Sequence, residues 1–130
     1  MRKSLCGSIA LTVLVAGSAW AHHSMSALFD FNERFTRTGT VTQLDWRNPH
    51  IYLFVDTKSD QGLVEHWAFE GPSPVVFRNI ENVGKSDFEN AVGMIVTVDA
   101  SRARDGSRTG LIRTITLPDG KVVTLCPNNC

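Results

Sequence analysis

The chain has 130 residues with 13 basic and 13 acidic side chains, and hydrophobic residues make up 42% of it. A chain of this length is expected to form one small domain. Its balanced charge argues against a basic surface that could hold nucleic acid, so we expect no nucleic-acid partner.

The first 21 residues have the pattern of a secretory signal peptide. Met1–Lys3 is positively charged, residues 5–17 form an apolar run, and Ala19–Ala21 matches the small-x-small cleavage pattern. The apolar run is too short to span a membrane as a stable helix, although an uncleaved anchor is the alternative. We therefore expect a periplasmic or secreted protein, free of the membrane after cleavage, with a single domain over residues 22–130.

Six β-strands are predicted after the cleavage site, because segments rich in β-branched and aromatic residues alternate with polar turns. Residues 22–37 show no clean period and are expected to form an extended arm that leads into the first strand. In the second strand, Ile51, Leu53 and Val55 should point to the same side. The predicted strands cover residues 36–46, 50–57, 63–70, 94–99, 109–117 and 121–125.

A short helix is predicted between the third and fourth strands. Ser73 can cap it and Pro74 suits the first helical position, so the helix should cover Pro74–Asn79. A further helical turn is predicted at 86–90, and a basic, turn-rich loop at 101–108. This order of elements is that of a small OB-type Greek-key barrel. We therefore predict an all-β fold of five or six strands; a generic antiparallel barrel or sandwich is the alternative.

The segment from Trp46 to His50 is predicted to form a sharp corner between the first two strands. Pro49 fixes its own φ and moves Asn48 out of the helical region, so the chain must turn or extend here. The corner should bring a large aromatic side chain and a histidine close together at one end of a two-stranded unit. We therefore expect a functional site at this corner.

Export would leave Cys126 and Cys130 as the only cysteines of the mature chain. In an oxidising compartment, an even pair at this spacing most simply forms a disulfide, which here would close a short loop at the C-terminus. Metal binding by the pair is the alternative, but two thiolates are only half of the usual structural zinc site.

Several short motifs occur together in an order that resembles a family of small exported bacterial proteins of unknown function. The resemblance covers essentially all of the mature chain, and it implies export and a small β-rich fold without implying an activity. The motifs are Ala21-His-His-Ser24, Thr38-Gly-Thr-Val41, Trp46-Arg-Asn-Pro-His50, Trp67 with Glu70, Ser73-Pro74, Arg104-Asp-Gly106 and Pro118-Asp-Gly120.

A looser resemblance links the chain to small periplasmic copper metallochaperones. Those proteins also use an OB-like barrel and bind the metal on its face with histidine, methionine and tryptophan. The same residue types are present here as His22, His23, Met25, Trp46 and His50. The spacing of that family's motif is absent, so the likeness is one of architecture.

If the signal peptide is cleaved at the predicted position, His22 becomes the N-terminal residue. Its α-amine and imidazole can then chelate one metal ion, and a third nitrogen can complete a site similar to a histidine-brace copper site. Nitrogen ligands suit Cu(II), which also heads the affinity order of the divalent ions. His50 is the first candidate for the third nitrogen, with His23 and His66 as second choices. Met25 offers a thioether for Cu(I).

Other interpretations of these histidines stay open. His22 and His23 could be the solvated start of the mature chain, and His50 could simply form a hydrogen bond across the corner. Cleavage after Ala19 would place His22 at the third position of the mature chain, where a histidine also binds Cu(II).

Three acidic residues near the ends of predicted strands have more than one interpretation. Asp45, Glu65 and Glu70 could orient histidines or act as an acid–base set. They could equally be solvated, as acidic side chains usually are.

The leading hypothesis is an exported protein that binds or delivers copper, with a periplasmic protein as a further partner. In it His22 and His50 are ligands, His23 and Met25 are auxiliaries, and Trp46 is a shield.

The alternative is an interaction module without metal, which binds a protein or a small ligand on an aromatic barrel face. That face would be formed by Trp46, Tyr52 and Trp67. A third hypothesis, an oxygen-activating copper enzyme, is not favoured, because so small a chain leaves little surface for a substrate beside the site. We therefore expect a protein that is not an enzyme.

Overall fold

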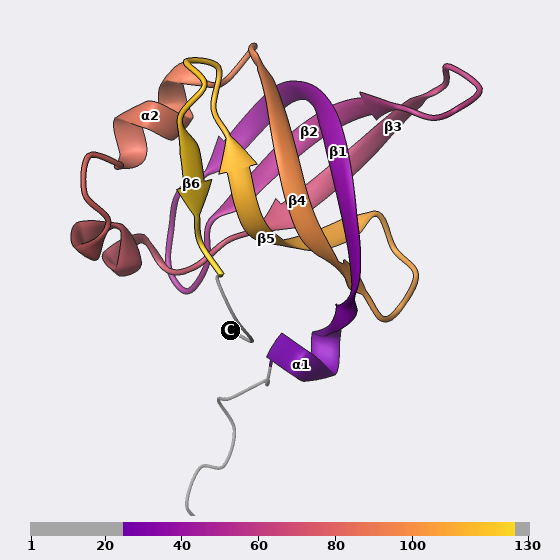
Figure 1. The fold of residues 1–130 in the computed structure, drawn as a ribbon, viewed down its shortest axis with the longest axis horizontal. Helices are drawn as coiled ribbons and strands as arrows, with labels where there is room; N and C mark the ends of the chain where they lie inside the picture. Colours follow the sequence, from indigo (N-terminus) through magenta and orange to yellow (C-terminus); the bar gives the residue numbers. More distant parts are fainter. Residues whose placement is uncertain (1–24, 127–130) are drawn as a thin grey trace, which may run out of the picture.

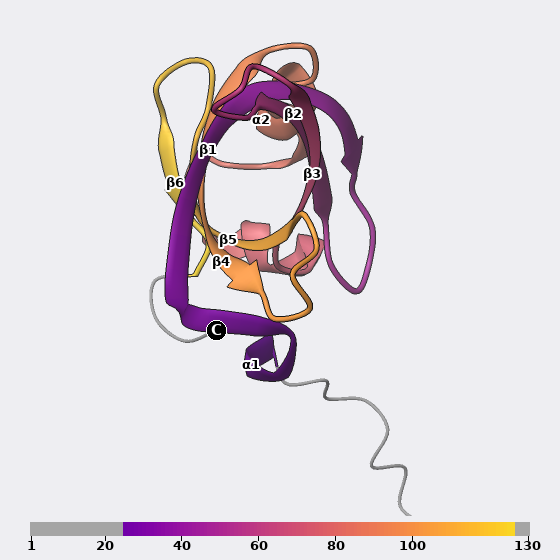
Figure 2. The same ribbon diagram turned by 90° about the vertical axis from the view of Figure 1, so that its right-hand side faces the viewer.

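One curled sheet of six strands dominates the computed structural model, which describes residues 25–126 (Figure 1). The strands follow the order β3-β2-β1-β4-β5-β6, and an additional pairing between β3 and β5 closes five of them into a near-complete ring (Figure 2). The strands are β1 Phe29–Asp45, β2 Tyr52–Lys58, β3 Val64–Glu70, β4 Ile95–Ala103, β5 Thr109–Thr116 and β6 Val122–Thr124.

The pairing pattern confirms the predicted OB-like barrel. Neighbouring strands along the sheet are antiparallel, whereas β3 and β5 close the ring with a parallel pairing. Closure pairs backbone groups that would otherwise lie at open sheet edges. β6 pairs with the second half of β5, beyond the residues of β5 that pair with β3, and is not part of the ring.

The long strand β1 pairs with two neighbouring strands. Its first half pairs with β4 and its second half with β2, and Gly39 and Thr40 pair with both. Gly39 allows this close approach, because a Cβ at this position would lie 2.2 Å from the backbone oxygen of Asp56. The predicted arm was wrong from Phe29 onward, since this residue is buried and pairs with Ala103 of β4.

Strand β4 is longer than predicted. The sequence indicated a loop from residue 101, but the strand continues to Ala103. Ala100 and Ser101 are fully buried, and they pair with Phe35 and Arg34 of β1. A bulge between Asp99 and Ala100 interrupts the alternation of side chains along the strand. The nearby arginines Arg102 and Arg104 made this segment resemble an exposed loop in the sequence.

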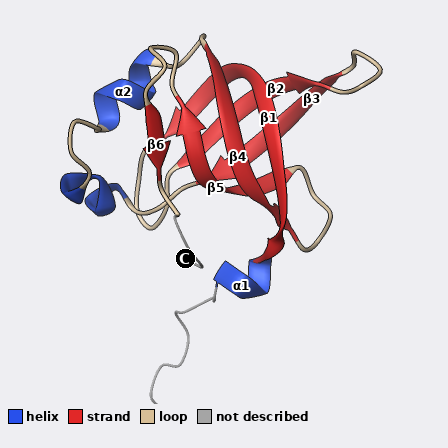
Figure 3. Cartoon of the chain, viewed as in Figure 1, coloured by secondary structure: helices blue, strands red, loops and turns tan. Residues whose placement is uncertain are grey.

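The barrel interior holds the main hydrophobic core. Ile51, Leu53 and Val55 share one fully buried side, as predicted, and valines and isoleucines of β4 and β5 face them. Two short helices close one end of the barrel (Figure 3) and contribute Phe77 and Phe88 to this core. These two helices are η1 Pro74–Asn79 and α2 Lys85–Asn90; a third, α1 Met25–Leu28, precedes β1.

The predicted helix start at Ser73 is confirmed. The Ser73 hydroxyl oxygen accepts a hydrogen bond from the backbone N–H of Val75, and Pro74 occupies the first helical position. The element is a 3₁₀-helix with the predicted bounds Pro74–Asn79. In the described range 25–126, every helix is too short or too polar to cross a membrane.

Candidate functional site

The predicted corner joins the end of β1 to the start of β2, and its Asn48–Pro49 peptide bond is cis. The chain leaving β3 holds it in place. Ile51 N–H donates to Pro72 O over 3.1 Å, and Gly71 N–H donates to Ile51 O over 2.9 Å. These two backbone hydrogen bonds fix the corner to the exit of β3.

A side chain from the same exit segment holds the corner as well. The Ser73 hydroxyl donates to Asn48 Oδ1 over 3.0 Å. A glycine is required at position 71, because a Cβ there would lie 2.7 Å from a side-chain carbon of Ile51. The position of His50, between Asn48 and Ile51, is therefore set by contacts on both sides of it.

His50 makes a short contact with a buried carboxylate. Its Nδ1 lies 2.5 Å from Oε1 of Glu70, whose side chain is only 7% exposed. The other carboxylate oxygen, Oε2, accepts a hydrogen bond of 2.9 Å from the Tyr52 hydroxyl. A carboxylate oxygen can only accept, so a hydrogen bond at this contact requires the proton on Nδ1 of His50. In a neutral imidazole with that proton on Nδ1, the lone pair is on Nε2.

Tyr52 is the second partner of the Glu70 carboxylate, and the two residues pair directly across β2 and β3. Burial raises the pKa of Tyr52 to about 12, helped by the hydrogen bond and negative charge of Glu70 and by the charge of Asp45. Tyr52 is thus a protonated donor throughout the neutral range. The buried carboxylate therefore has two fixed partners, one on each oxygen.

A cavity of about 290 Å³ opens beside His50. Its wall is mostly apolar and includes Val76, Leu111, Ile112 and Leu125 together with the chain from Gly71 to Ser73. Two residues whose side chains can ligate a metal ion, Met25 and His50, also lie on this wall, together with Cys126. The structure thus brings two of the predicted donors, Met25 and His50, to one cavity.

Three of the predicted site residues cannot be placed. His22, His23 and Cys130 lie outside the described residues. Cys126 is buried, 3% exposed, and is disulfide-bonded in the structure. Its predicted partner is Cys130, and that pairing stays a prediction.

His66 lies away from the cavity. It sits on β3 opposite Asp56, with its Nδ1 2.6 Å from Asp56 Oδ1, and its side chain is 80% exposed. Four residues of strand separate His66 from Glu70, which corresponds to about 13 Å. The structure therefore does not bring His66 and His50 into one site.

The three predicted aromatic site residues do not share a surface. Trp46 packs on Phe77 and Phe88 at the helical end of the core, with ring centroids 4.6 and 5.5 Å apart. Trp67 is 4% exposed and pairs with Val55 on the inner side of the sheet. Tyr52 lies on the opposite side, because it is an odd number of residues from Val55.

The three acidic candidates have different partners. Asp45 forms an ion pair of 2.7 Å with Arg47, and Glu65 accepts a hydrogen bond of 3.1 Å from the Trp67 indole N–H. Glu70 alone contacts a histidine of the corner. The sequence left open whether these acidic residues orient a histidine, and Glu70 is the one placed to orient His50.

The metal donors that the structure describes form an incomplete set. Within residues 25–126, no group of three or more histidine, cysteine, aspartate or glutamate side chains is arranged to hold a metal ion. A metal ion at His50 and Met25 would therefore need further ligands from the segment that precedes Met25 or from a change at Cys126.

Comparison with known proteins places the chain in a family. The model of a family of unknown function, DUF6152, matches residues 10–113. The chain belongs to this family. No curated protein and no solved structure matched the chain. Membership in DUF6152 confirms the expectation of a family of unknown function, and it indicates no activity for the corner.

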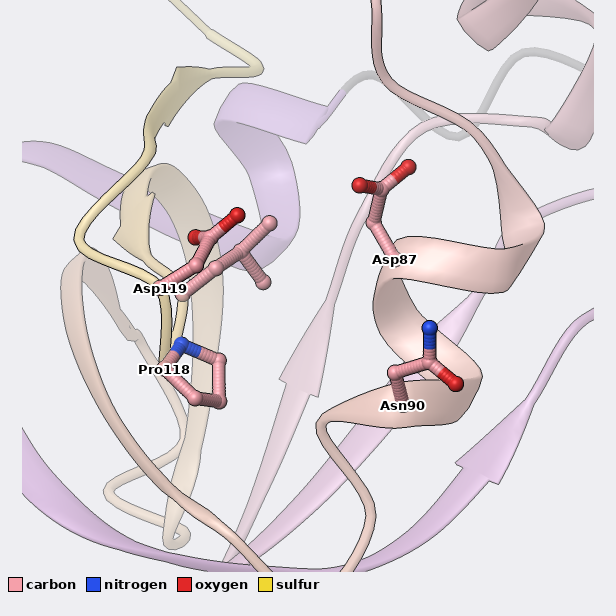
Figure 4. Close-up of a pocket in the computed structure, with 5 residues that line it drawn as sticks. Asp87, Asn90, Pro118 and Asp119 are labelled. Atoms are coloured by element: carbon pink, nitrogen blue, oxygen red, sulfur yellow. The ribbon is translucent and has the colours of Figure 1, made fainter.

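A second, smaller hollow of about 170 Å³ lies between α2 and the turn that joins β5 to β6. Asp87, Asn90 and Asp119 surround it (Figure 4). Lys121 forms an ion pair of 2.8 Å with Asp87 and also donates to the backbone oxygen of Asn82. The hydrogen bond from Lys121, followed by one from the Gly84 N–H, lowers the pKa of Asp87. These contacts are structural, and they make the hollow the weaker candidate.

Proposed function

We propose that this DUF6152 protein is exported and binds copper at the corner of the barrel, where it stores the ion or passes it on. The observation that carries the proposal is that His50 and Met25 lie on one cavity wall while a buried carboxylate fixes the histidine ring. The site residues are His50 and Met25, together with His22 and His23 of the preceding segment.

The Glu70 contact supports the ligand role of His50. Histidines that bind metal commonly donate their other ring N–H to a carboxylate, which fixes the ring and increases its basicity. Nδ1 of His50 lies against a buried carboxylate in the same manner, and the side chain is 35% exposed. Nε2 is therefore the nitrogen that would bind the ion from the cavity.

The position of Met25 supports a contribution from the predicted N-terminus. Met25 lies on the cavity wall, and only three peptide units separate it from His22. Three residues of chain span at most about 11 Å. His22, with its α-amine after cleavage, is thus within reach of the cavity by length alone.

Copper is the ion that fits this donor set best. Imidazole and amine nitrogens suit Cu(II), and a thioether such as that of Met25 suits Cu(I). The likeness to copper metallochaperones is part of this proposal and rests on the OB-like barrel and on the residue types. An aromatic-face interaction module has less support, because Trp67 is buried and Tyr52 lies on the other side of the sheet.

A competition titration against a Cu(II) chelator of known affinity tests the proposal, using mature protein that begins at His22. His50→Ala should weaken copper binding by roughly tenfold or more, because it removes a body ligand. His66→Ala is the matched control, since this exposed histidine also contacts a carboxylate but lies away from the cavity. Equal affinities of the His50→Ala variant and the unaltered protein would refute the corner site.

A further inference from the structure

Cys126 adds a third metal donor to the cavity, which the proposed function does not use. We propose that reduction of the Cys126 disulfide converts the cavity into a Cu(I) site formed by the Cys126 thiolate, the Met25 thioether and the His50 imidazole. This inference rests on the proposed function for Met25 and His50. It adds that reduction of the disulfide controls the same site and that the bound copper is Cu(I).

The structure places the two sulfur-bearing residues in one packed group. Met25 packs against a cluster that contains Phe29, Leu111 and Cys126. Cys126 is held beside β5, because its N–H and that of Leu125 both donate to the backbone oxygen of Arg113, over 3.2 and 2.8 Å. These backbone contacts do not depend on the disulfide, so a reduced Cys126 would remain at the cavity wall.

His50 lies on the wall of the same cavity, so the cavity offers sulfur and nitrogen donors together. Thiolate and thioether sulfurs select Cu(I) over harder ions. A disulfide sulfur carries no charge, whereas a thiolate does. The surrounding wall is apolar, and an unpaired cation is costly to hold in such surroundings. A thiolate would neutralise the single charge of Cu(I) there.

The chemical step is a thiol–disulfide exchange with a dithiol reductant, either a small dithiol or a protein with a paired-cysteine site. The reductant gives up two electrons and two protons and becomes a disulfide. Cys126 and its partner cysteine each become a thiol. Binding of Cu(I) then displaces the proton of the Cys126 thiol, and the copper stays in the Cu(I) state throughout.

Two matched single variants test the inference. Cys130→Ser leaves the Cys126 thiol at the cavity, whereas Cys126→Ser leaves one thiol at position 130 instead. Both variants carry the same number of free thiols, and neither can form the predicted disulfide. Cu(I) affinity is measured without oxygen by competition with a Cu(I)-specific chelator, alongside unaltered protein in its oxidised and dithiol-reduced forms. Thermal melts check that both variants are folded.

The expected result is that Cys130→Ser and the reduced protein bind Cu(I) roughly tenfold or more tightly than the oxidised protein. Cys126→Ser should bind like the oxidised protein. Equal affinities of the two variants, or no gain on reduction, would overturn the inference.

The proposed function and the redox inference are refuted by different outcomes. If the oxidised protein binds copper through His50 but Cys130→Ser brings no gain, only the redox inference is wrong. If His50→Ala leaves copper binding of the oxidised protein unchanged, the proposed function itself is wrong.

Discussion

His50 Nδ1 and Glu70 Oε1 lie 2.5 Å apart, joining the corner before β2 to the last residue of β3. The Glu70 carboxylate is buried and also accepts the Tyr52 hydroxyl hydrogen bond. This contact engages Nδ1 of His50, so it links the barrel fold to the proposed copper site, in which Nε2 is the ligand.

Glu70→Gln should weaken copper binding by roughly 10- to 100-fold, the usual effect of losing the partner that orients a metal-binding histidine. The glutamine amide can donate or accept, so it no longer selects the protonated Nδ1 form of His50. Copper competition titrations measure the affinity, and nitrogen NMR of His50 reports the tautomer directly. Glu89→Gln is the control, because Glu89 is an exposed residue paired with Lys85. An unchanged tautomer and affinity in Glu70→Gln would count against the positioning role.

Tyr52 should titrate near pH 12, about two units above an ordinary tyrosine. It is the only tyrosine in the chain, so the phenolate absorbance reports it alone. Between about pH 10 and 12 the unfolded chain loses this proton first, so folding stability should fall as pH rises. Tyr52→Phe should remove the part of this pH-dependent loss of folding stability that Tyr52 causes. Glu70→Gln should lower the pKa of Tyr52. A transition near pH 10 in the folded protein would disagree with the burial and hydrogen bond described.

Acetylation of the α-amine of protein that begins at His22 should lower Cu(II) affinity by roughly tenfold or more, because it removes a chelating nitrogen. Mass spectrometry before the titration confirms that only the α-amine was modified. The same treatment of the His50→Ala variant is the control and should have a smaller effect, since two ligands of the proposed site are then altered. Full affinity after acetylation would exclude a brace-like site and leave the side chains of His50, Met25, His22 and His23 as the proposed donors.

Gly39→Ala should destabilise the barrel by about 2 kcal/mol or more, because the new methyl group would collide with the backbone oxygen of Asp56. Gly84→Ala is the matched control, since a Cβ at that position meets no atom within 4 Å and the backbone there is extended. Urea unfolding gives both free energies. Similar losses for the two variants would show that β1 and β2 do not approach closely at Gly39.

Local sequence patterns predicted the parts of the fold that local chemistry controls. The cap at Ser73 followed by Pro74 is one example, and the alternation of Ile51, Leu53 and Val55 is another. The order of strands around a short helix then indicated the OB-like barrel. The extension of β4 could not be predicted in this way, because a bulge at Asp99 breaks the period that sequence reading relies on.

The candidate site depends on contacts between distant segments, and these are less visible in a sequence. Glu70 was one of three acidic candidates, and only the register of β2 with β3 distinguishes it from Asp45 and Glu65. The proximity of Met25 and Cys126 joins the two ends of the described chain, and no local pattern indicates it. Trp67 was a candidate binding residue because tryptophan suits ligand surfaces, but the alternation of β3 places it inside.

We propose that the protein is exported and that it holds copper at His50. Native mass spectrometry of protein purified from the periplasm after export through its own signal tests this most directly, because one spectrum reports the N-terminus, the disulfide and any bound metal. We predict a mass that begins at His22 and carries one copper ion, and the loss of that ion in His50→Ala. A correctly cleaved protein that stays free of metal after copper addition, or a His50→Ala variant that retains the ion, would contradict the account.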